Sequence, residues 1–241
     1  MKKKLNDSPF MRWTALVLVA SMMFFAYMFV DMLSPLKELL DTTLNWNSTT
    51  FGTYAASEYF LNVFCFFLIF AGVILDKMGI RFTGLLSASL MVLGASIKFY
   101  AMSDWFVGTG LESWLNSWWV DLPGSAKLAC FGFMIFGCGC EMAGTTVSKA
   151  IAKWFKGKEM AMAMGLEMSI ARLGVFAAMW VSPMMSEAFN NSVSAPVAFG
   201  AVLLMIGLIF YFVFVLMDRK FDAQLEAAGE LKEEASEEEF K

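Results

Sequence analysis

Long apolar runs separated by short polar segments constrain the fold of this chain more than any other feature. Each run is about as long as the ~20 mostly apolar residues that a helix needs to cross a bilayer. The runs are continuous rather than alternating, which favours helices over a transmembrane β-barrel. We therefore expect an all-α membrane protein with six transmembrane helices, over residues 13–33, 53–75, 82–102, 125–148, 160–185 and 197–217.

The composition agrees with this expectation. Of the 241 residues, 59% are hydrophobic and only 17% are charged, whereas soluble domains carry ~25% charged residues. The opening stretch MKKKLNDSPFMRW leads into an apolar run that is longer than a signal-peptide core and has no small-residue cleavage site after it. We read residues 1–12 as a cytoplasmic N-terminus and the first run as an uncleaved span.

Lysine and arginine predict the orientation, because cytoplasmic loops carry an excess of them. With six spans both termini share one side, and the opposite side holds only Lys37 and Lys127. Both termini are therefore expected in the cytoplasm, in a cell (inner) membrane or, for a eukaryotic chain, a lysosomal-type membrane. The side with the termini holds Lys2, Lys3, Lys4, Arg12, Lys77, Arg81, Lys149, Lys153, Lys156, Lys158, Arg219 and Lys220.

Two segments outside the spans have their own character. Residues 103–124 form the longest outer segment, where leucine and tryptophan recur at helical spacing between 111 and 122. This pattern predicts an amphipathic helix in the membrane interface, with a lid over an outer opening as the alternative. Residues 218–241 contain nine acidic and four basic side chains, which indicates an acidic, solvated cytoplasmic tail, helical or disordered, or the start of a central linker.

A compact charge cluster, GVILDKMGIR at residues 72–81, separates the second and third runs. It resembles the signature of the major facilitator superfamily, which lies in the cytoplasmic loop between those two spans. We expect a glycine to permit close helix approach, the aspartate to cap or pair with nearby charges, and a second glycine to permit a tight turn. A loop that only sets topology is the alternative. Ile80 departs from the signature, and the matching residues are Gly72, Asp76, Lys77, Gly79 and Arg81.

Residues 137–144 and 154–174 resemble the lysosomal dipeptide transporter branch of that superfamily. One departure is Phe133, where the superfamily often has an arginine, so a proton-coupling role for that arginine does not carry over. Members have twelve spans in two halves, and the resemblance implies one six-helix half here. Its spans divide as a 3+3 inverted repeat, over residues 13–102 and 125–217. A truncated product, a split-gene subunit and a half that pairs with its own copy all remain open.

Charged residues inside the spans are candidate site residues, because such charges are expensive in a bilayer. Glu141 and Arg172 lie at similar depth, ~20 Å from the cytoplasmic turn between their spans. They form either a substrate clamp or a structural ion pair. Glu58 has Asn62 one helical turn below it, and Glu167 is expected nearer the inside. Asp31 and Lys98 are expected near the outer ends of their spans, where long side chains snorkel.

The resemblance implies a transporter that works by alternating access on small peptides (dipeptides) or other small organic ions. The candidate substrate-binding residues are Glu141, Arg172, Glu58, Asn62 and Asp31. The expected partners are the lipid bilayer, the substrate and a second six-helix half, with no nucleic acid. The alternative is a non-transporting half that acts as an assembly partner.

Catalytic and metal-binding patterns do not stand out in this sequence. It contains no histidine, which removes the commonest metal ligand and general base, and it has no P-loop or hydrolase signature. We therefore expect neither an enzyme nor a bound cofactor. The four cysteines fall within predicted spans and are interpreted as packing residues: Cys65, Cys130, Cys138 and Cys140.

Overall fold

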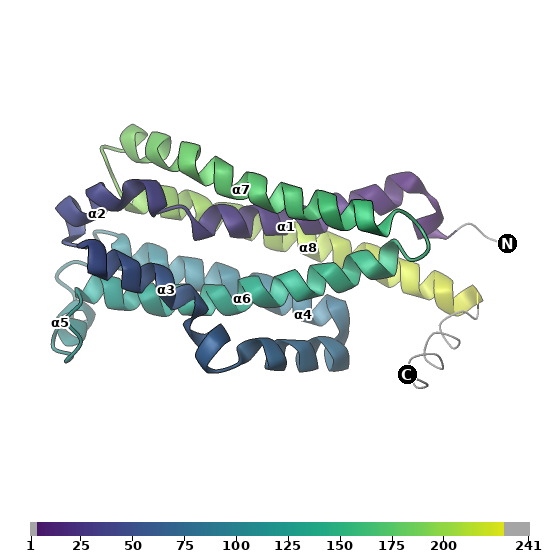
Figure 1. Cartoon of the computed structure of the whole chain (residues 1–241), viewed down its shortest axis with the longest axis horizontal. Coiled ribbons are helices and arrows are strands. Elements are labelled where there is room, and N and C mark those ends of the chain that lie inside the picture. The colour runs from purple at the N-terminus through teal and green to yellow at the C-terminus, as the bar shows by residue number, and fades with distance from the viewer. Residues whose placement is uncertain (1–3, 229–241) are drawn as a thin grey trace.

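The computed structural model describes residues 4–228, and every regular element in that range is a helix. Figure 1 shows most of the long helices side by side along one axis, which confirms the all-α expectation. The elements are η1 (Leu5–Asp7), α1 (Pro9–Val30), η2 (Ser34–Leu36), α2 (Lys37–Leu44), α3 (Ser48–Phe64), α4 (Phe67–Met102), α5 (Gly110–Asn116), α6 (Gly124–Trp154), α7 (Met160–Ala188) and α8 (Ser194–Ala228).

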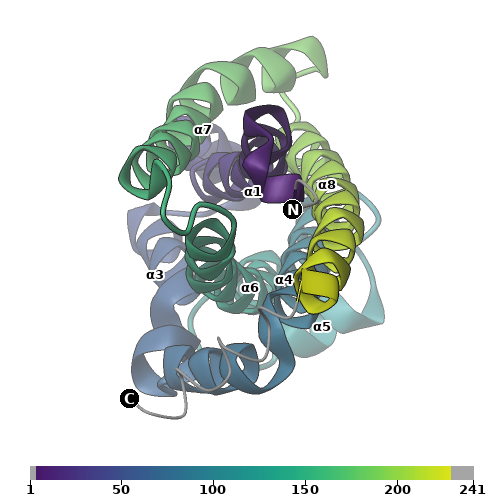
Figure 2. The same cartoon turned by 90° about the vertical axis from the view of Figure 1, so that its right-hand side faces the viewer.

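The bundle has two distinct ends. The short helices α2 and α5 lie at one end, whereas α1 begins and α8 finishes at the other (Figure 1). In the end-on view α1 lies between α7 and α8, and it packs against both (Figure 2). Helix α6 packs against α3 and α4, and α4 also packs against α8. The bundle is therefore held by contacts between helices that are far apart in the sequence.

Five segments of the described chain are long and apolar enough to cross a membrane: Pro9–Leu44, Phe67–Met102, Gly124–Trp154, Met160–Ala188 and Ser194–Ala227. Large apolar side chains lie exposed along several of them, for example Phe131, Trp180 and Ile209. A water-soluble protein rarely exposes so much contiguous apolar surface. Both features fit a chain whose outer surface faces lipid.

The second predicted span, residues 53–75, is not continuous, so the six-span arrangement is not confirmed. Helix α3 ends at Phe64, and Phe66 has a left-handed φ of 51° before α4 begins at Phe67. A bulky residue rarely adopts this conformation, and here it interrupts the helical hydrogen bonding within the apolar run. The first turns of α4 bend away from the bundle (Figure 1) and expose Ile69 and Phe70.

Glycines set the closest helix contacts. A Cβ added at Gly132 of α6 would lie 2.7 Å from the carbonyl oxygen of Gly94 of α4, and the reverse contact is just as tight. Where α3 crosses α6, a Cβ at Gly137 would overlap the carbonyl group of Glu58. Small residues let helix backbones approach in this way in membranes. Gly137 therefore lets α3, which carries Glu58, pack closely against the middle of α6.

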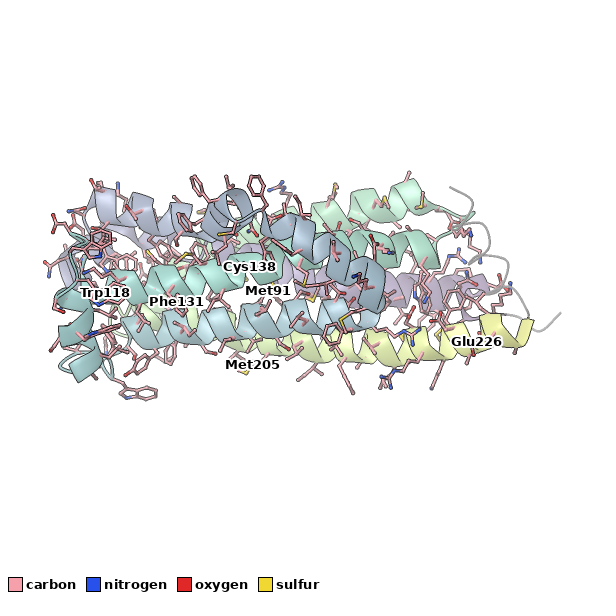
Figure 3. The ribbon with its side chains drawn as sticks, turned by 90° about the horizontal axis from the view of Figure 1, so that it is seen from below. Met91, Trp118, Phe131, Cys138, Met205 and Glu226 are labelled. Carbon is pink, nitrogen blue, oxygen red and sulfur yellow. The ribbon has the colours of Figure 1, made fainter. Side chains whose placement is uncertain are left out.

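The outer segment 103–124 is less helical than expected. Helix α5 ends at Asn116, so the predicted amphipathic helix stops before Trp118 and Trp119. The rings of Trp114 and Trp118 still meet edge to face with centroids 4.7 Å apart, and Trp119 is 92% exposed. Figure 3 shows Trp118 and Glu226 at opposite ends of the bundle.

The predicted tail begins inside a helix. Helix α8 continues past residue 217 to Ala228, and Asp218 is completely buried. The helical form is one of the two that were expected and most side chains of its first turns are exposed, but Asp218 is not solvated, because it is drawn into contacts with α4 and α6. The rest of the predicted tail lies outside the described residues.

Candidate functional site

A small cavity opens between the end of α1, the first half of α3 and the start of α6. Its volume is about 130 Å³, and its walls include Asp31, Tyr54, Glu58, Tyr59 and Phe133. Two of the predicted site residues thus line one cavity. The cavity combines carboxylate and aromatic groups, and such a lining suits a ligand with both polar and apolar parts.

The two carboxylates of this cavity are held differently. Glu58 is only 4% exposed, and it is fixed by the contact of α3 with Gly137 on α6. Asp31 is the C-cap residue of α1 and accepts a hydrogen bond from the Ser34 hydroxyl at 3.2 Å. A carboxylate at a helix C-terminus faces the negative end of the helix dipole, which is unfavourable. Neither carboxylate forms an ion pair with a described residue.

Lys98 on α4 is completely buried behind the cavity wall. The expectation that it snorkels to the outer surface is wrong, because α1, α3 and α6 close around it. Its Nζ lies 4.2 Å from the ring centroid of Phe29, 4.5 Å from that of Phe133 and 5.1 Å from that of Tyr54. Within the part of the chain that the structure describes, this ammonium group has no hydrogen-bond partner.

Sequence reasoning named Lys98 among the charges inside the spans but did not select it as a substrate-binding residue. A usable signal was present, since it is the only charged residue in the predicted span 82–102. Its distance from the span's end favoured snorkelling instead. The stacked rings of Tyr54 and Phe133, 4.8 Å apart, cover it on the cavity side, and that arrangement depends on three separate helices.

Glu141 and Arg172 do not form the ion pair that was one of the two alternatives. The Arg172 guanidinium instead lies 5.2 Å from the ring centroid of Tyr27 on α1. Glu141, Glu167 and Arg172 are all close enough for their charges to act on the Tyr27 hydroxyl group. These residues therefore surround Tyr27, with Glu141 half-buried on α6 and Arg172 exposed on α7.

Arg172 also lines an open hollow along α7 together with Met168, Ser169, Leu173 and Phe176. Asp31 and Glu141 both act electrostatically on Glu58, so the charge of Glu141 near Tyr27 influences the cavity beside α3. Asn62, the remaining predicted site residue, is buried and donates weakly to the Glu58 carbonyl oxygen at 3.4 Å. The five predicted substrate-binding residues thus lie on α3, α6 and α7 and at the C-cap of α1.

The signature segment at residues 72–81 lies at the opposite end from α5. Gly79 has φ 74°, so the chain turns there as predicted. Asp76 forms an ion pair with Lys149 on α6, and its Oδ1 lies 2.7 Å from the lysine Nζ. Gly72 behaves differently from expectation, because a Cβ added there would have no atom within 4 Å. In the described chain it therefore permits no close helix approach, since the start of α4 bends away from the bundle.

Arg81 belongs to a partly buried ionic cluster that joins α4, α6 and α8 around the fully buried Asp218. Its Nε binds the Asp218 carboxylate at 2.9 Å, and its Nη2 contacts Asp222. Lys153 on α6 binds the same two aspartates at 2.8 and 2.6 Å, and the Trp154 indole donates to Asp218 at 3.0 Å. The signature arginine thus anchors the end of α8, a role that sequence reasoning did not assign.

The N-terminal turn packs near this cluster. Arg12 forms an ion pair with Glu159 at 3.1 Å, and Lys158 forms one with Asp7 at 3.0 Å. A backbone hydrogen bond from Lys4 and a side-chain bond from Lys158 lower the pKa of Asp7. These contacts tie the start of α1 to the turn between α6 and α7.

A bundle of apolar helices with buried charges around a cavity is typical of a polytopic membrane protein. Comparison with known proteins identifies the family, because the family model of the Major Facilitator Superfamily matches residues 19–239. The chain belongs to this family. As a member of a transporter family with five apolar candidate spans among its described residues, it is an integral membrane protein.

Curated relatives are similar over part of their length. The lysosomal dipeptide transporter MFSD1 of Danio rerio is 30% identical over 164 residues, and that of Homo sapiens is 27% identical over 165 residues. Each alignment covers 68% of this chain but 31% of the relative. The chain thus matches less than a third of the length of these relatives. No solved structure matches it.

Proposed function

We propose that this chain is the N-terminal six-helix half of a transporter that moves dipeptides or other small organic ions by alternating access. One observation carries the proposal: Glu141 and Arg172 lie unpaired on neighbouring helices around the same tyrosine. A dipeptide has an ammonium and a carboxylate at a fixed separation. An acid and an arginine that do not neutralise each other are free to take one terminus each.

In this mechanism Arg172 binds the substrate carboxylate through two parallel hydrogen bonds, which its planar guanidinium permits. Glu141 accepts the ammonium group. Asp31, Glu58 and Asn62 form the neighbouring wall, in which the cavity of about 130 Å³ receives part of a side chain. The similarity to a lysosomal dipeptide transporter supports this substrate class.

The helix contacts support a 3+3 inverted repeat. In that arrangement α1, the segment from α3 into the start of α4, and the remainder of α4 correspond to α6, α7 and α8. The repeat relates the α1–α7 contact to the α3–α6 contact, and the α1–α8 contact to the α4–α6 contact. All four contacts are present, as is the α4–α8 contact that maps onto itself.

A second six-helix half completes the proposed site. Arg172, Met168 and Phe176 are exposed on α7, although an exposed arginine at mid-bundle would be costly against lipid. A second half, in the same or another chain, covers this face. Both termini then lie in the cytoplasm, and the segment with Asp76, Lys77 and Arg81 meets the second half and balances the inward- and outward-facing states.

The test uses the protein in detergent and in lipid vesicles. We expect free dipeptides to raise the thermal unfolding midpoint, since a ligand at 100 times its Kd stabilises by ~2.7 kcal/mol. Dipeptides blocked at the N- or C-terminus should do so much less, and labelled dipeptide should accumulate in the vesicles. Equal stabilisation by free and blocked peptides would exclude the clamp. No binding and no uptake of any dipeptide would favour a non-transporting assembly partner.

A further inference from the structure

Lys98 lies in an environment where a charged ammonium group is energetically costly. It is fully buried, it lacks a hydrogen-bond partner among the described residues, and three aromatic rings surround it. Cation–π contacts contribute ~2 kcal/mol or more when desolvated, whereas an unpaired buried charge costs several kcal/mol. The rings alone therefore do not compensate for the burial of this charge, so that a nearby counter-charge is required.

The counter-charges come from two neighbouring helices. Glu58 of α3 and Asp31 at the end of α1 both act electrostatically on Lys98. Neither is within ion-pair distance of it, since no such pair occurs among the described residues. Tyr54, from α3, lies beside the ammonium group, and its own hydroxyl is buried without a partner.

The charges around Glu58 do not balance when all groups are ionised. Asp31 from α1 and Glu141 from α6 add negative charge, and Lys98 from α4 is the cation that acts on Glu58 among the described residues. The other titratable groups near this centre, Tyr54 and Tyr59 on α3 and Cys130 and Cys140 on α6, are of types that carry no charge at neutral pH in their ordinary form. Binding of a single proton by a carboxylate removes one unit of the excess negative charge.

Glu58 is the group best placed to bind that proton. It is more deeply buried than Asp31 or Glu141, and it lines a cavity that extends to Asp31 near the outer end of α1. We propose that Glu58 is the binding site of an exchangeable proton, that Lys98 is the basic group that positions it, and that proton binding there accompanies transport.

The chemistry needs no further reactant. A proton from water bonds to a carboxylate oxygen of Glu58, and the same O–H bond breaks when the proton leaves. The aromatic rings between Lys98 and the cavity keep the two groups apart, so the ammonium polarises the carboxylate without a permanent ion pair. Membrane proteins use buried carboxylates in this way in proton relays. The coupling to transport rests on the proposed function, but the proton site itself does not.

The site is tested first without any substrate. Infrared difference spectra of the purified protein between neutral and acidic buffer should contain the carbonyl band of a protonated carboxylic acid. Glu58→Gln should lose part of that band. Glu187→Gln, the same change at an exposed position on α7, should keep the component that Glu58→Gln loses. An unchanged band in a folded Glu58→Gln protein would overturn the assignment.

Lys98→Met is the second variant and is informative even if Glu58→Gln does not fold. We expect it to shift the pH midpoint of the protonated-carboxyl band by about one unit or more, as loss of a nearby opposite charge does. Lys98→Arg should retain most of the wild-type midpoint. If Lys98→Met leaves the midpoint unchanged, Lys98 does not position the proton site.

Coupling is measured separately by calorimetry of dipeptide binding in two buffers with different ionisation heats. Wild type should exchange about one proton per dipeptide, and Glu58→Gln none. Binding with no proton exchange in wild type would overturn the coupling and leave the proposed transport intact. A Glu58 band without any dipeptide binding would contradict the proposed substrate but support the proton site.

Discussion

The guanidinium Nε of Arg81 on α4 lies 2.9 Å from a carboxylate oxygen of Asp218 on α8, and this aspartate is completely buried. The contact joins residues 137 positions apart in the chain. Lys153 and Trp154 of α6 bind the same carboxylate. The two residues thus link the signature segment to the last helix of the bundle, at the end where α1 begins.

We predict that Asp218→Asn strongly destabilises the protein. The substitution leaves Arg81 and Lys153 without their shared buried partner, and removal of one member of a buried ion pair costs ~3–5 kcal/mol. The thermal unfolding midpoint in detergent should fall by many degrees. Asp41→Asn, at an exposed position on α2, is the matched control and should change little. Equal midpoints for both variants would show that the cluster is not stabilising.

Asp76→Ala should behave in the opposite way. Its ion pair with Lys149 is exposed on both sides, and such pairs contribute ~0–1 kcal/mol. We therefore expect a nearly unchanged unfolding midpoint together with reduced dipeptide uptake, if this segment balances the two transport states. If the variant takes up dipeptide at the wild-type rate, the segment only sets the topology.

Gly79→Ala is expected to destabilise through the backbone alone. Gly79 has φ 74° and ψ 171° with open space around it, so a side chain meets no clash, but this nearly glycine-only backbone conformation costs ~1–3 kcal/mol. Gly72→Ala provides the comparison, because it also has open space but lies within regular helix. Unfolding midpoints should be lower for Gly79→Ala and unchanged or slightly higher for Gly72→Ala.

Gly94→Ala tests the contact between α4 and α6. The new methyl group would overlap the backbone of Gly132, which cannot rotate away as a side chain can. Overpacking of this kind costs ~1–3 kcal/mol. Gly52→Ala, where the methyl group meets open space, should be tolerated. The contact is not tight if both variants unfold at the wild-type temperature.

For the proposed clamp, Arg172→Lys should impair dipeptide binding almost as much as Arg172→Ala. Lysine keeps the charge but loses the planar, two-pronged hydrogen-bonding surface. Glu141→Gln should weaken binding of free dipeptides, whereas N-blocked dipeptides should lose little further affinity. The measurement is the rise in the thermal unfolding midpoint that peptide causes in each of the three variants and in wild type. Full rescue of binding by lysine would indicate a role for charge alone.

Part of this protein follows directly from its sequence. Long apolar runs require helices in a bilayer, because unpaired backbone groups cannot be exposed to lipid. The segment with Gly79 predicted a turn and a resemblance to the family that the comparison then matched. Charges within apolar runs marked Glu58 and Glu141 as candidate site residues. These inferences depend on local composition and spacing, which one sequence contains in full.

Tertiary structure decided the rest. Lys98 is near enough to the end of its span to snorkel, yet rings from α1, α3 and α6 bury it. Asp218 is part of an acidic run, yet Arg81 and Lys153 bury it as a shared counter-charge. The surroundings of both residues are built by helices distant in sequence. Whether a charge is solvated or enclosed is set by those neighbours, because the energy of an ion depends on what replaces its water.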